Sequence, residues 1–345
     1  MNDLWTALKS AGAPVLLYGM GDGAEKLLRV CKSKEIEVGG IFCTDGFERG
    51  KRFHGMEVVP YSEAKRRYGR FTVLLAFGSA REEVLLQIAR VADEQSLYIP
   101  DLPVAGETLF DGAFYEEHRA EFDRARALLA DERSKAVFDA AVRAKLYGRL
   151  EDFSTATTTL EEDFSQILHP RNYKNCVDLG AYDGDSARFL TGQSPGIEKI
   201  YAFEPDEKTF ARLKKRSEGL PVECLPCAAW DREEELTFAR GGNRGSGVGD
   251  GKRTATVRGV RGDSVFEGKR VDFIKFDVEG AEKRALAGLE KTIGKNRPEM
   301  LISCYHRPED LFELPLYIAE KYRFYRLYLR RQKCLPAWEL RLYCI

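Results

Sequence analysis

The stretch Cys176-Val-Asp-Leu-Gly-Ala-Tyr-Asp-Gly-Asp-Ser186 decides the fold. An apolar run is followed by a glycine-rich turn and a helix start at Asp185, which predicts a buried strand, a tight turn and a helix. Gly180 and Gly184 lack a Cβ atom, so the backbone can turn sharply there and a ligand can approach it closely. Asp178 is expected near the carboxyl end of the strand, where open α/β sheets bind their ligands.

A second acidic residue is expected at the end of the next strand. In Ile200-Tyr-Ala-Phe-Glu-Pro205, Glu204 stands 24 residues after Gly180. An acid at about this spacing is placed to accept hydrogen bonds from the hydroxyls of a ribose. The two strand ends together predict a ligand that contains adenosine. The alternative is that Glu204 is an ordinary acid in a strand-end turn.

Composition indicates a globular protein of two domains. The chain has 345 residues, of which 43% are apolar, and its net charge is −1. One hydrophobic core rarely grows that large, and a balanced charge argues against a nucleic-acid partner. No apolar run reaches the roughly 18 residues of a membrane span, and the N-terminus lacks the features of a signal peptide. Eight scattered cysteines suit a reducing compartment, so we expect a cytoplasmic protein.

Residues 1–104 are predicted to form a smaller Rossmann-like α/β domain. Apolar strands are expected at 15–18, 38–43, 53–59, 71–77 and 97–99, with helices between them. This alternation is typical of a parallel sheet with both faces covered. The turn Gly19-Met-Gly-Asp-Gly23 resembles a dinucleotide-binding turn whose third glycine comes one position early, and Asp45 could meet a ribose. The domain could hold a nucleotide-linked sugar, or it could serve only for docking.

Residues 105–174 are predicted to be a helical connector, and residues 175–345 a second α/β domain. Helical periodicity runs over 120–147 and Gly148 is a plausible stop; the connector could also supply a substrate lid or a homodimer interface. Further strands are expected at 176–179, 199–203, 222–225, 271–276 and 300–304, with an antiparallel edge pair at 322–329 and 340–345. A glycine-rich stretch, 240–251, is flanked by strand-like runs at 235–239 and 254–260. It is interpreted as a flexible hairpin whose Asn243 and Ser246 could contact a substrate.

The second domain resembles the FkbM family of class I S-adenosylmethionine-dependent methyltransferases. The resemblance rests on Val177-Asp-Leu-Gly-Ala-Tyr-Asp-Gly-Asp-Ser186, Ala202-Phe-Glu-Pro-Asp206 and, above all, Val271-Asp-Phe-Ile-Lys-Phe-Asp-Val-Glu-Gly-Ala-Glu282. Tyr305-His-Arg-Pro-Glu-Asp-Leu311 also matches, whereas Tyr182 stands where many class I enzymes have a glycine. The resemblance implies a seven-stranded sheet with the last strand antiparallel. It also implies S-adenosylmethionine as cofactor and O-methylation of a hydroxyl on a sugar or other natural-product-like small molecule.

The resemblance assigns cofactor roles to the strand ends. Backbone N–H groups of the glycine turn favour an anion, here the methionine carboxylate. Asp178 is expected near the amino-acid moiety, Glu204 at the ribose and the segment 227–231 beside the adenine, although Trp230 could equally be ordinary core. The expected cofactor-binding residues are Asp178, Gly180, Ala181, Tyr182, Gly184, Glu204, Ala228, Ala229 and Asp277.

Two residues are expected to take part in catalysis. Asp277 ends the fourth strand, next to the expected methyl group, where its carboxylate could orient the acceptor. His306 follows the fifth strand and is the candidate general base, because an unperturbed pKa of about 6.5 suits proton removal near neutral pH. A lone histidine is, however, often only structural. Glu279 could join Asp277 and His306 in a metal site, but we expect no metal, and Glu282 is interpreted as a helix N-terminal acid.

Two other functions stay open at this point. The first domain could make the protein a nucleotide-sugar or NAD(P)-dependent enzyme. Alternatively, the protein could be a non-catalytic nucleotide-binding scaffold. Neither the acceptor nor the oligomeric state is fixed by the sequence.

Overall fold

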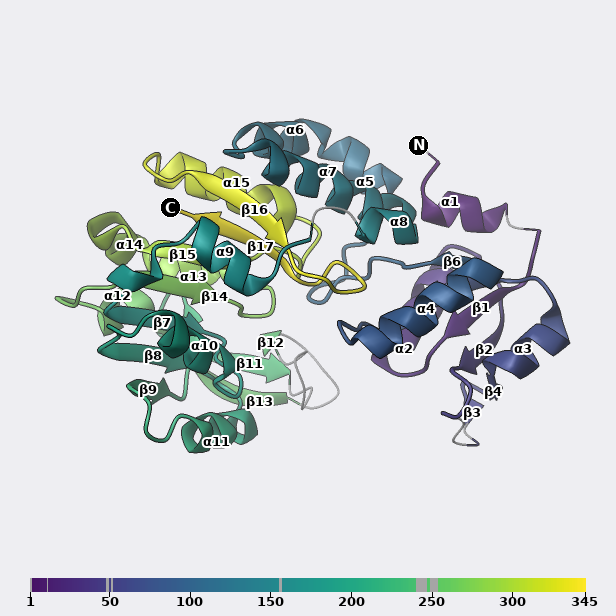
Figure 1. The fold of residues 1–345 in the computed structure, drawn as a ribbon, viewed down its shortest axis with the longest axis horizontal. Coiled ribbons are helices and arrows are strands. Elements are labelled where there is room, and N and C mark those ends of the chain that lie inside the picture. The colour runs from purple at the N-terminus through teal and green to yellow at the C-terminus, as the bar shows by residue number, and fades with distance from the viewer. Residues whose placement is uncertain are drawn as a thin grey trace.

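The computed structural model describes residues 2–10, 12–47, 50, 52–154, 157–239, 247–248 and 254–345, with the backbone alone at 239, 247 and 248. Two α/β units lie at opposite ends of the molecule, and a layer of helices lies over the C-terminal unit and reaches the near edge of the N-terminal unit (Figure 1). The expected fold class is confirmed, because each unit is built on its own largely parallel sheet. The domain boundaries at 104 and 174 stay a prediction.

The N-terminal unit has a six-stranded sheet in the order β3-β4-β2-β1-β5-β6. Helices α1 and α2 cover one face, and α3 and α4 cover the other. The strands are β1 (Val15–Tyr18), β2 (Val38–Cys43), β3 (Arg52–Phe53), β4 (Met56–Pro60), β5 (Thr72–Leu75) and β6 (Ser96–Tyr98), and the helices are α1 (Leu4–Lys9), α2 (Asp22–Ser33), α3 (Tyr61–Tyr68) and α4 (Glu82–Glu94).

The prediction of a single strand at 53–59 is wrong. Two antiparallel strands, β3 and β4, occupy this region, and they are joined by His54 and Gly55, which have φ angles of 48° and 80°. Two successive positive φ angles match the twist of a tight hairpin turn. The glycine after a histidine was the signal in the sequence.

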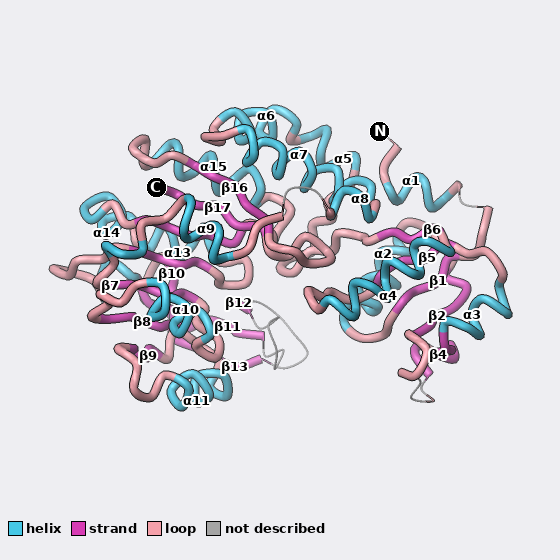
Figure 2. The backbone as a smooth tube through the Cα atoms, viewed as in Figure 1, coloured by secondary structure: helices cyan, strands magenta, loops and turns pink. Residues whose placement is uncertain are grey.

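The connector forms a helical layer against the C-terminal unit (Figure 2). Phe122 and Phe138 from this layer pack in one buried cluster with Phe312 and Leu329 of the C-terminal unit. As expected, helix α7 ends at Gly148, which adopts a left-handed conformation. The helices are α5 (Gly112–Glu117), α6 (Arg119–Ala127), α7 (Glu132–Tyr147), α8 (Leu150–Phe153), α9 (Leu160–Gln166) and the short 3₁₀ helix η1 (Pro170–Asn172).

The C-terminal unit has a seven-stranded sheet in the order β16-β17-β15-β14-β7-β8-β9. Its strands are β7 (Asn175–Leu179), β8 (Lys199–Phe203), β9 (Val222–Leu225), β14 (Phe273–Phe276), β15 (Glu299–Ser303), β16 (Leu327–Arg331) and β17 (Leu340–Cys344). The expected antiparallel last strand is confirmed, because β17 runs antiparallel to both of its neighbours. The order of the strands reverses between β7 and β14, which is the position where sheets of this kind bind ligands.

Helices cover both faces of this sheet. The helices α13 (Glu282–Gly288), α14 (Glu290–Asn296) and α15 (Asp310–Lys321) pack on the same face as α6 and α7, whereas α9, α10 (Asp185–Gln193) and α11 (Glu207–Arg216) pack on the other. The strand expected at 322–329 begins only at Leu327, because Tyr322 still closes helix α15 by bonding the carbonyl of Ile318 and a turn follows it.

A small second sheet lies beside the main one. It joins β10 (Ala228–Trp230), β13 (Thr254–Arg261), β11 (Glu234–Ala239) and β12 (Gly247–Val248), and the short helix α12 (Gly262–Val265) follows it. The sequence predicted β11 and β13 but missed β10. The hairpin expected at 240–251, with Asn243 and Ser246, lies outside the described residues except for the two residues of β12.

The loop between β16 and β17 reaches the N-terminal unit (Figure 1). Leu335 and Ser79 exchange two backbone hydrogen bonds of 2.8 and 3.0 Å, and Leu335 is buried in the core of that unit. Gly78 lies so close to the ring of Trp338 that a Cβ atom there would stand 2.2 Å from it. The two units are therefore held together by paired backbone as well as by side chains. In the described part of the chain, no helix combines the length and apolar character that crossing a membrane requires.

An ion pair fastens the connector to the edge of the C-terminal sheet, and its contribution should depend on pH. Arg330 of β16 lies 2.7 Å from Asp131, which also caps helix α7. Burial would raise the pKa of Asp131, but bonds from Arg330 and Ser134 lower it to about 2. A native pKa below the unfolded value means that the pair stabilises the fold at neutral pH and that this stabilisation is lost as pH falls from about 4 to about 2.

We expect Asp131→Asn, which keeps the helix cap, to lower the free energy of unfolding by about 1 kcal/mol at pH 6, after allowance for solvent screening of a partly exposed carboxylate. Urea unfolding at several pH values should show this difference shrinking toward pH 2.5. Asp139→Asn, which removes a more exposed pair with Arg126, is the control and should cost less. A difference that stays constant with pH would contradict this account of the pair.

Candidate active site

The glycine turn after β7 lies directly against the end of β14. Gly180 has a φ angle of 80°, and a Cβ atom at this position would stand 1.9 Å from the carbonyl oxygen of Asp277. The N–H groups of Gly180 and Ala181 both bond the carbonyl of Phe203. Gly184, also left-handed, is the N-cap of helix α10. Only glycine at position 180 lets the two strand ends meet this closely.

Glu204 closes the turn from the neighbouring strand. One carboxylate oxygen accepts a bond of 3.1 Å from the N–H of Tyr182, and the other accepts a bond of 2.8 Å from the N–H of Asp206. Burial raises the pKa of Glu204 to about 7. The structure therefore brings Glu204 and the glycine turn together, as the sequence predicted. The two backbone bonds of Glu204 are also those expected if it is an ordinary acid in a strand-end turn.

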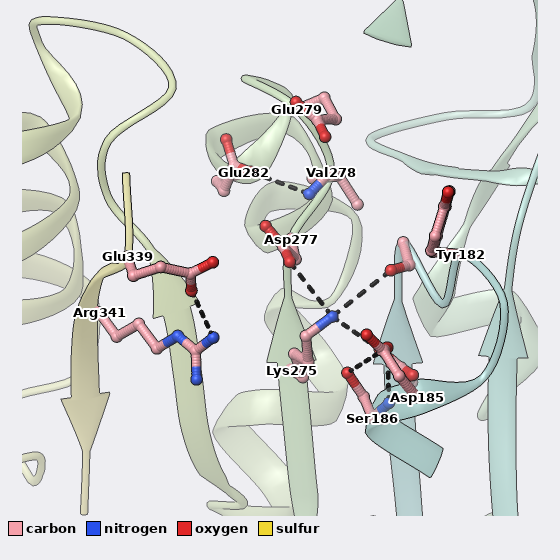
Figure 3. Close-up of polar contacts among 12 residues, drawn as sticks. Tyr182, Asp185, Ser186, Lys275, Asp277, Val278, Glu279, Glu282, Glu339 and Arg341 are labelled. Carbon is pink, nitrogen blue, oxygen red and sulfur yellow. Dashed lines mark hydrogen bonds and ion pairs between the residues drawn. The ribbon is translucent and has the colours of Figure 1, made fainter. Parts of the chain in front are cut away.

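A buried lysine joins the two strand ends. Lys275 of β14 points toward Asp277 (Figure 3). Its ammonium lies 3.1 Å from Asp178 and 3.4 Å from Asp277. Burial alone would lower the pKa of Lys275, but the two carboxylates raise it. Burial raises the pKa of Asp178, and Lys275 opposes that rise. Sequence reasoning missed Lys275, although a lysine inside the apolar run 271–276 was a visible signal.

A cluster of carboxylates surrounds His306 above the end of β14. Its Nε2 lies 3.6 Å from Asp277 and 3.5 Å from Glu279, and its Nδ1 lies 2.9 Å from Glu282. Glu279 and Glu282 belong to the loop and helix that follow Asp277 (Figure 3). The imidazole is fully buried, and neither ring nitrogen makes a hydrogen bond to a residue that the structure describes.

Burial and the charges of neighbouring groups shift the pKa values of the residues in this cluster. Burial would lower the pKa of His306, but Glu282, Glu279 and Asp277 raise it to about 10. Burial would likewise raise the pKa of Asp277, which Lys275 and His306 bring down to about 2. Burial raises the pKa of Glu279 to about 7. Strongly shifted groups of this kind, gathered at a ligand-binding edge, are typical of active sites.

Glu282 is more than a helix N-terminal acid. It accepts a hydrogen bond of 2.9 Å from the N–H of Val278, which is the expected N-terminal role, but it also faces His306. Glu282, His306 and Asp310 lie close enough to hold a metal ion, and all three are buried. Sequence reasoning gave Asp310 no role in the site.

The remaining predicted residues lie beside this centre or away from it. Ala228 and Ala229 are buried on β10, three to four residues beyond Leu225, whose carbonyl bonds Glu204. Trp230 is half-buried and donates to Glu234. His54 pairs with Glu25, His169 pairs with Glu299 at the start of β15, and His118 stacks on Phe312. Asp45 accepts a hydrogen bond from the N–H of Ser62.

The comparisons with known proteins agree with this geometry. Residues 178–333 match the model of the methyltransferase FkbM domain. The crystal structure of a methyltransferase FkbM from Methylobacillus flagellatus shares the fold, with a TM-score of 0.74 at 20% identity over 96% of this chain and 90% of that one. An Aeropyrum pernix fibrillarin with bound S-adenosyl-L-methionine aligns over 52% of this chain and 70% of its own, at 12% identity and a TM-score of 0.35, which is too low to carry an argument. No curated protein matches the sequence.

The strand order, the antiparallel β17 and the glycine turn at the switch point define a class I methyltransferase fold. Within that class, the match over residues 178–333 makes the C-terminal unit an FkbM methyltransferase domain, and the full-length structural likeness shows that the fold of the whole chain is shared. The resemblance noticed in the sequence is thereby confirmed.

The close approach at Gly180 gives a direct test of the site's architecture. Gly180→Ala should lower the free energy of unfolding by about 2 kcal/mol or more, because the added methyl group meets the backbone of Asp277 and the φ angle is unfavourable for alanine. Gly192→Ala is the matched control: this helical glycine of α10 has open space around it and should gain up to about 1 kcal/mol. Thermal unfolding of both variants checks the pair, and equal behaviour would refute the described contact.

Proposed function

We propose that the protein transfers a methyl group from S-adenosylmethionine to a hydroxyl of a sugar or other natural-product-like small molecule. The observation that carries the proposal is the meeting, at the switch point of the sheet, of the glycine turn, Glu204 and the cluster of carboxylates around His306. The first two suit an adenosine-containing donor, and the third suits proton removal from an acceptor.

The residues of the turn fit the proposed donor. Gly180 excludes a side chain from the turn, and the N–H groups at the start of α10 favour a carboxylate. Glu204 ends the strand beside the turn, where it could exchange its backbone bonds for those of a ribose diol. S-adenosylmethionine, when bound, supplies a methyl group on a positively charged sulfur. Asp277, ionised because its pKa is held near 2, would face that charge.

His306 is proposed to accept the proton of the acceptor hydroxyl at Nε2. Glu282, 2.9 Å from Nδ1, would orient the ring and stabilise the imidazolium that forms. Asp277 and Glu279 flank Nε2 and could accept hydrogen bonds from neighbouring hydroxyls of the acceptor. The same negative charges would repel a phosphate or carboxylate at this position, which supports a neutral polyhydroxylated acceptor.

The first domain adds no reaction to this proposal. Its turn has Gly19 and Gly21 at positive φ angles and leads into helix α2, as a dinucleotide-binding turn would. Nucleotide binding by that turn stays a prediction.

Donor binding tests the first half of the proposal. Glu204→Ala should raise the Kd for S-adenosylmethionine at least about tenfold, because charge-assisted hydrogen bonds to a diol contribute roughly 1.5–3 kcal/mol. Calorimetric titration measures this effect, with Glu218→Ala, an exposed acid in the turn after α11, as control. If the wild-type protein binds neither S-adenosylmethionine nor S-adenosylhomocysteine, the proposal fails.

The pH dependence of transfer tests the second half. A base must be neutral to act, and the pKa of His306 in the free protein is about 10, so kcat/KM should rise with pH, up to tenfold per unit, between about pH 7 and pH 10. His306→Ala should remove this rise and lower kcat by about 100-fold or more, with donor affinity unchanged. His54→Ala serves as control.

These rates should be measured with a panel of hydroxylated acceptors after dialysis against EDTA, since Glu282, His306 and Asp310 could hold a metal. A kcat/KM that is flat with pH in the wild type would remove His306 from the mechanism. Activity lost on chelation would contradict the metal-free role proposed for it.

A further inference from the structure

The backbone of His306 is held by the segment that leaves the N-terminal unit. Residues 103–106 lie between β6 and α5, and the N–H groups of Val104 and Ala105 both donate to the carbonyl oxygen of His306, at 3.0 and 2.9 Å. These two bonds fix the peptide plane from which the imidazole projects. The position of the ring among its carboxylates therefore depends on where this segment lies.

The same segment also touches the loop that carries the carboxylates. A Cβ atom at Gly280 would stand 2.4 Å from the Cβ of Ala105, so segment and loop are in close contact. Arg307 donates from Nε to the carbonyl of Gly280 at 2.8 Å, and its Nη1 lies near Gly106. The segment 103–106 is thus packed between the two loops that supply Glu279, Glu282 and His306.

One side chain of the N-terminal unit forms hydrogen bonds with this segment. The ammonium of Lys26, on helix α2, donates to the carbonyl of Pro103 at 3.0 Å and approaches the carbonyl of Val104 at 3.4 Å. Bonds with an ionised donor are stronger than neutral ones. The carbonyls of Pro103 and Val104 belong to the same two peptide groups as the N–H groups of Val104 and Ala105 that bond His306, so a shift of Lys26 is passed on within single planar peptide groups.

The chain just before the segment is anchored independently of Lys26. Asp101 forms a fully buried ion pair with Lys145 of α7, at 2.9 Å. That pair fixes this part of the chain to α7. Lys26 instead joins the carbonyls of Pro103 and Val104 to helix α2.

We propose that Lys26 is a positioning residue for methyl transfer: through the carbonyls of Pro103 and Val104 it sets the segment 103–106, and thereby His306, in the active arrangement. The role rests on the proposed function in one respect, namely that His306 takes part in the transfer. Through the position of His306, it gives the N-terminal unit an indirect part in the reaction.

The experiment compares Lys26→Met with Lys26→Arg and with Lys32→Met. Methionine keeps the length of the side chain but removes its donor, arginine keeps a charged donor, and Lys32 is an exposed lysine of the same helix. Lys26→Met should lower kcat about five- to twentyfold at saturating donor and acceptor, because small misplacements of a reacting group are costly. The Kd for S-adenosylmethionine should stay within about twofold, Lys26→Arg should recover most of the rate, and Lys32→Met should behave as wild type.

A second readout follows His306 without any need for turnover. The ring resonances of His306, identified in NMR spectra by their loss in His306→Gln, should move in Lys26→Met and stay in place in Lys32→Met. A purely structural role for Lys26 would lower the thermal midpoint without moving either kcat or this signal.

The outcomes separate the two proposals. If the wild type binds no donor and transfers no methyl group, the proposed function fails, and the NMR comparison alone decides whether Lys26 positions His306. If the wild type is active, the proposal requires that kcat falls and the His306 signal moves together in Lys26→Met. An unchanged kcat, or a reduced kcat with an unmoved His306 signal, overturns it.

Discussion

The ion pairs of Lys275 are the interaction on which the site depends. A single buried ammonium lies between Asp178 at the end of β7 and Asp277 beyond the end of β14. Like charges this close would repel in a medium of low polarity, and removing one partner from such a buried group typically costs about 3–5 kcal/mol. The lysine therefore holds together two strand ends that Gly180 allows to touch, and the ligand-binding edge of the sheet exists because both conditions are met.

Above that edge, carboxylates outnumber the groups that can carry a positive charge. Asp277, Glu279, Glu282 and Asp310 gather around one imidazole, and burial holds the pKa values of Glu279 and Asp310 near 7 while that of His306 rises to about 10. Buried negative charge that exceeds its counter-charge is unfavourable unless a cation or a proton joins it. A surplus of this kind suits a site whose proposed donor is itself a cation.

Much of this arrangement could be predicted from the sequence, because its determinants are local. The glycine turn, the acid that ends the next strand and the histidine after β15 each follow an apolar run, and parallel strands bring such positions to one edge. The pairing of Glu282 with His306 and the segment over His306 could not be predicted, since they bring together residues far apart in the chain whose meeting depends on the loops. The late start of β16 was missed because an aromatic run fits a helix end as well as a strand.

The backbone bonds between Ser79 and Leu335 have a consequence for how such proteins diverge. Main-chain pairing requires a path for the chain but hardly any particular side chain, so it survives extensive substitution. Two units joined in this way can drift in sequence while keeping their mutual orientation, which fits a shared full-length architecture at 20% identity. Exchanging one unit for that of a distant relative should then succeed more readily than the low identity suggests. The condition is that the loop between β16 and β17 and the segment around Ser79, with which it pairs, come from the same parent protein.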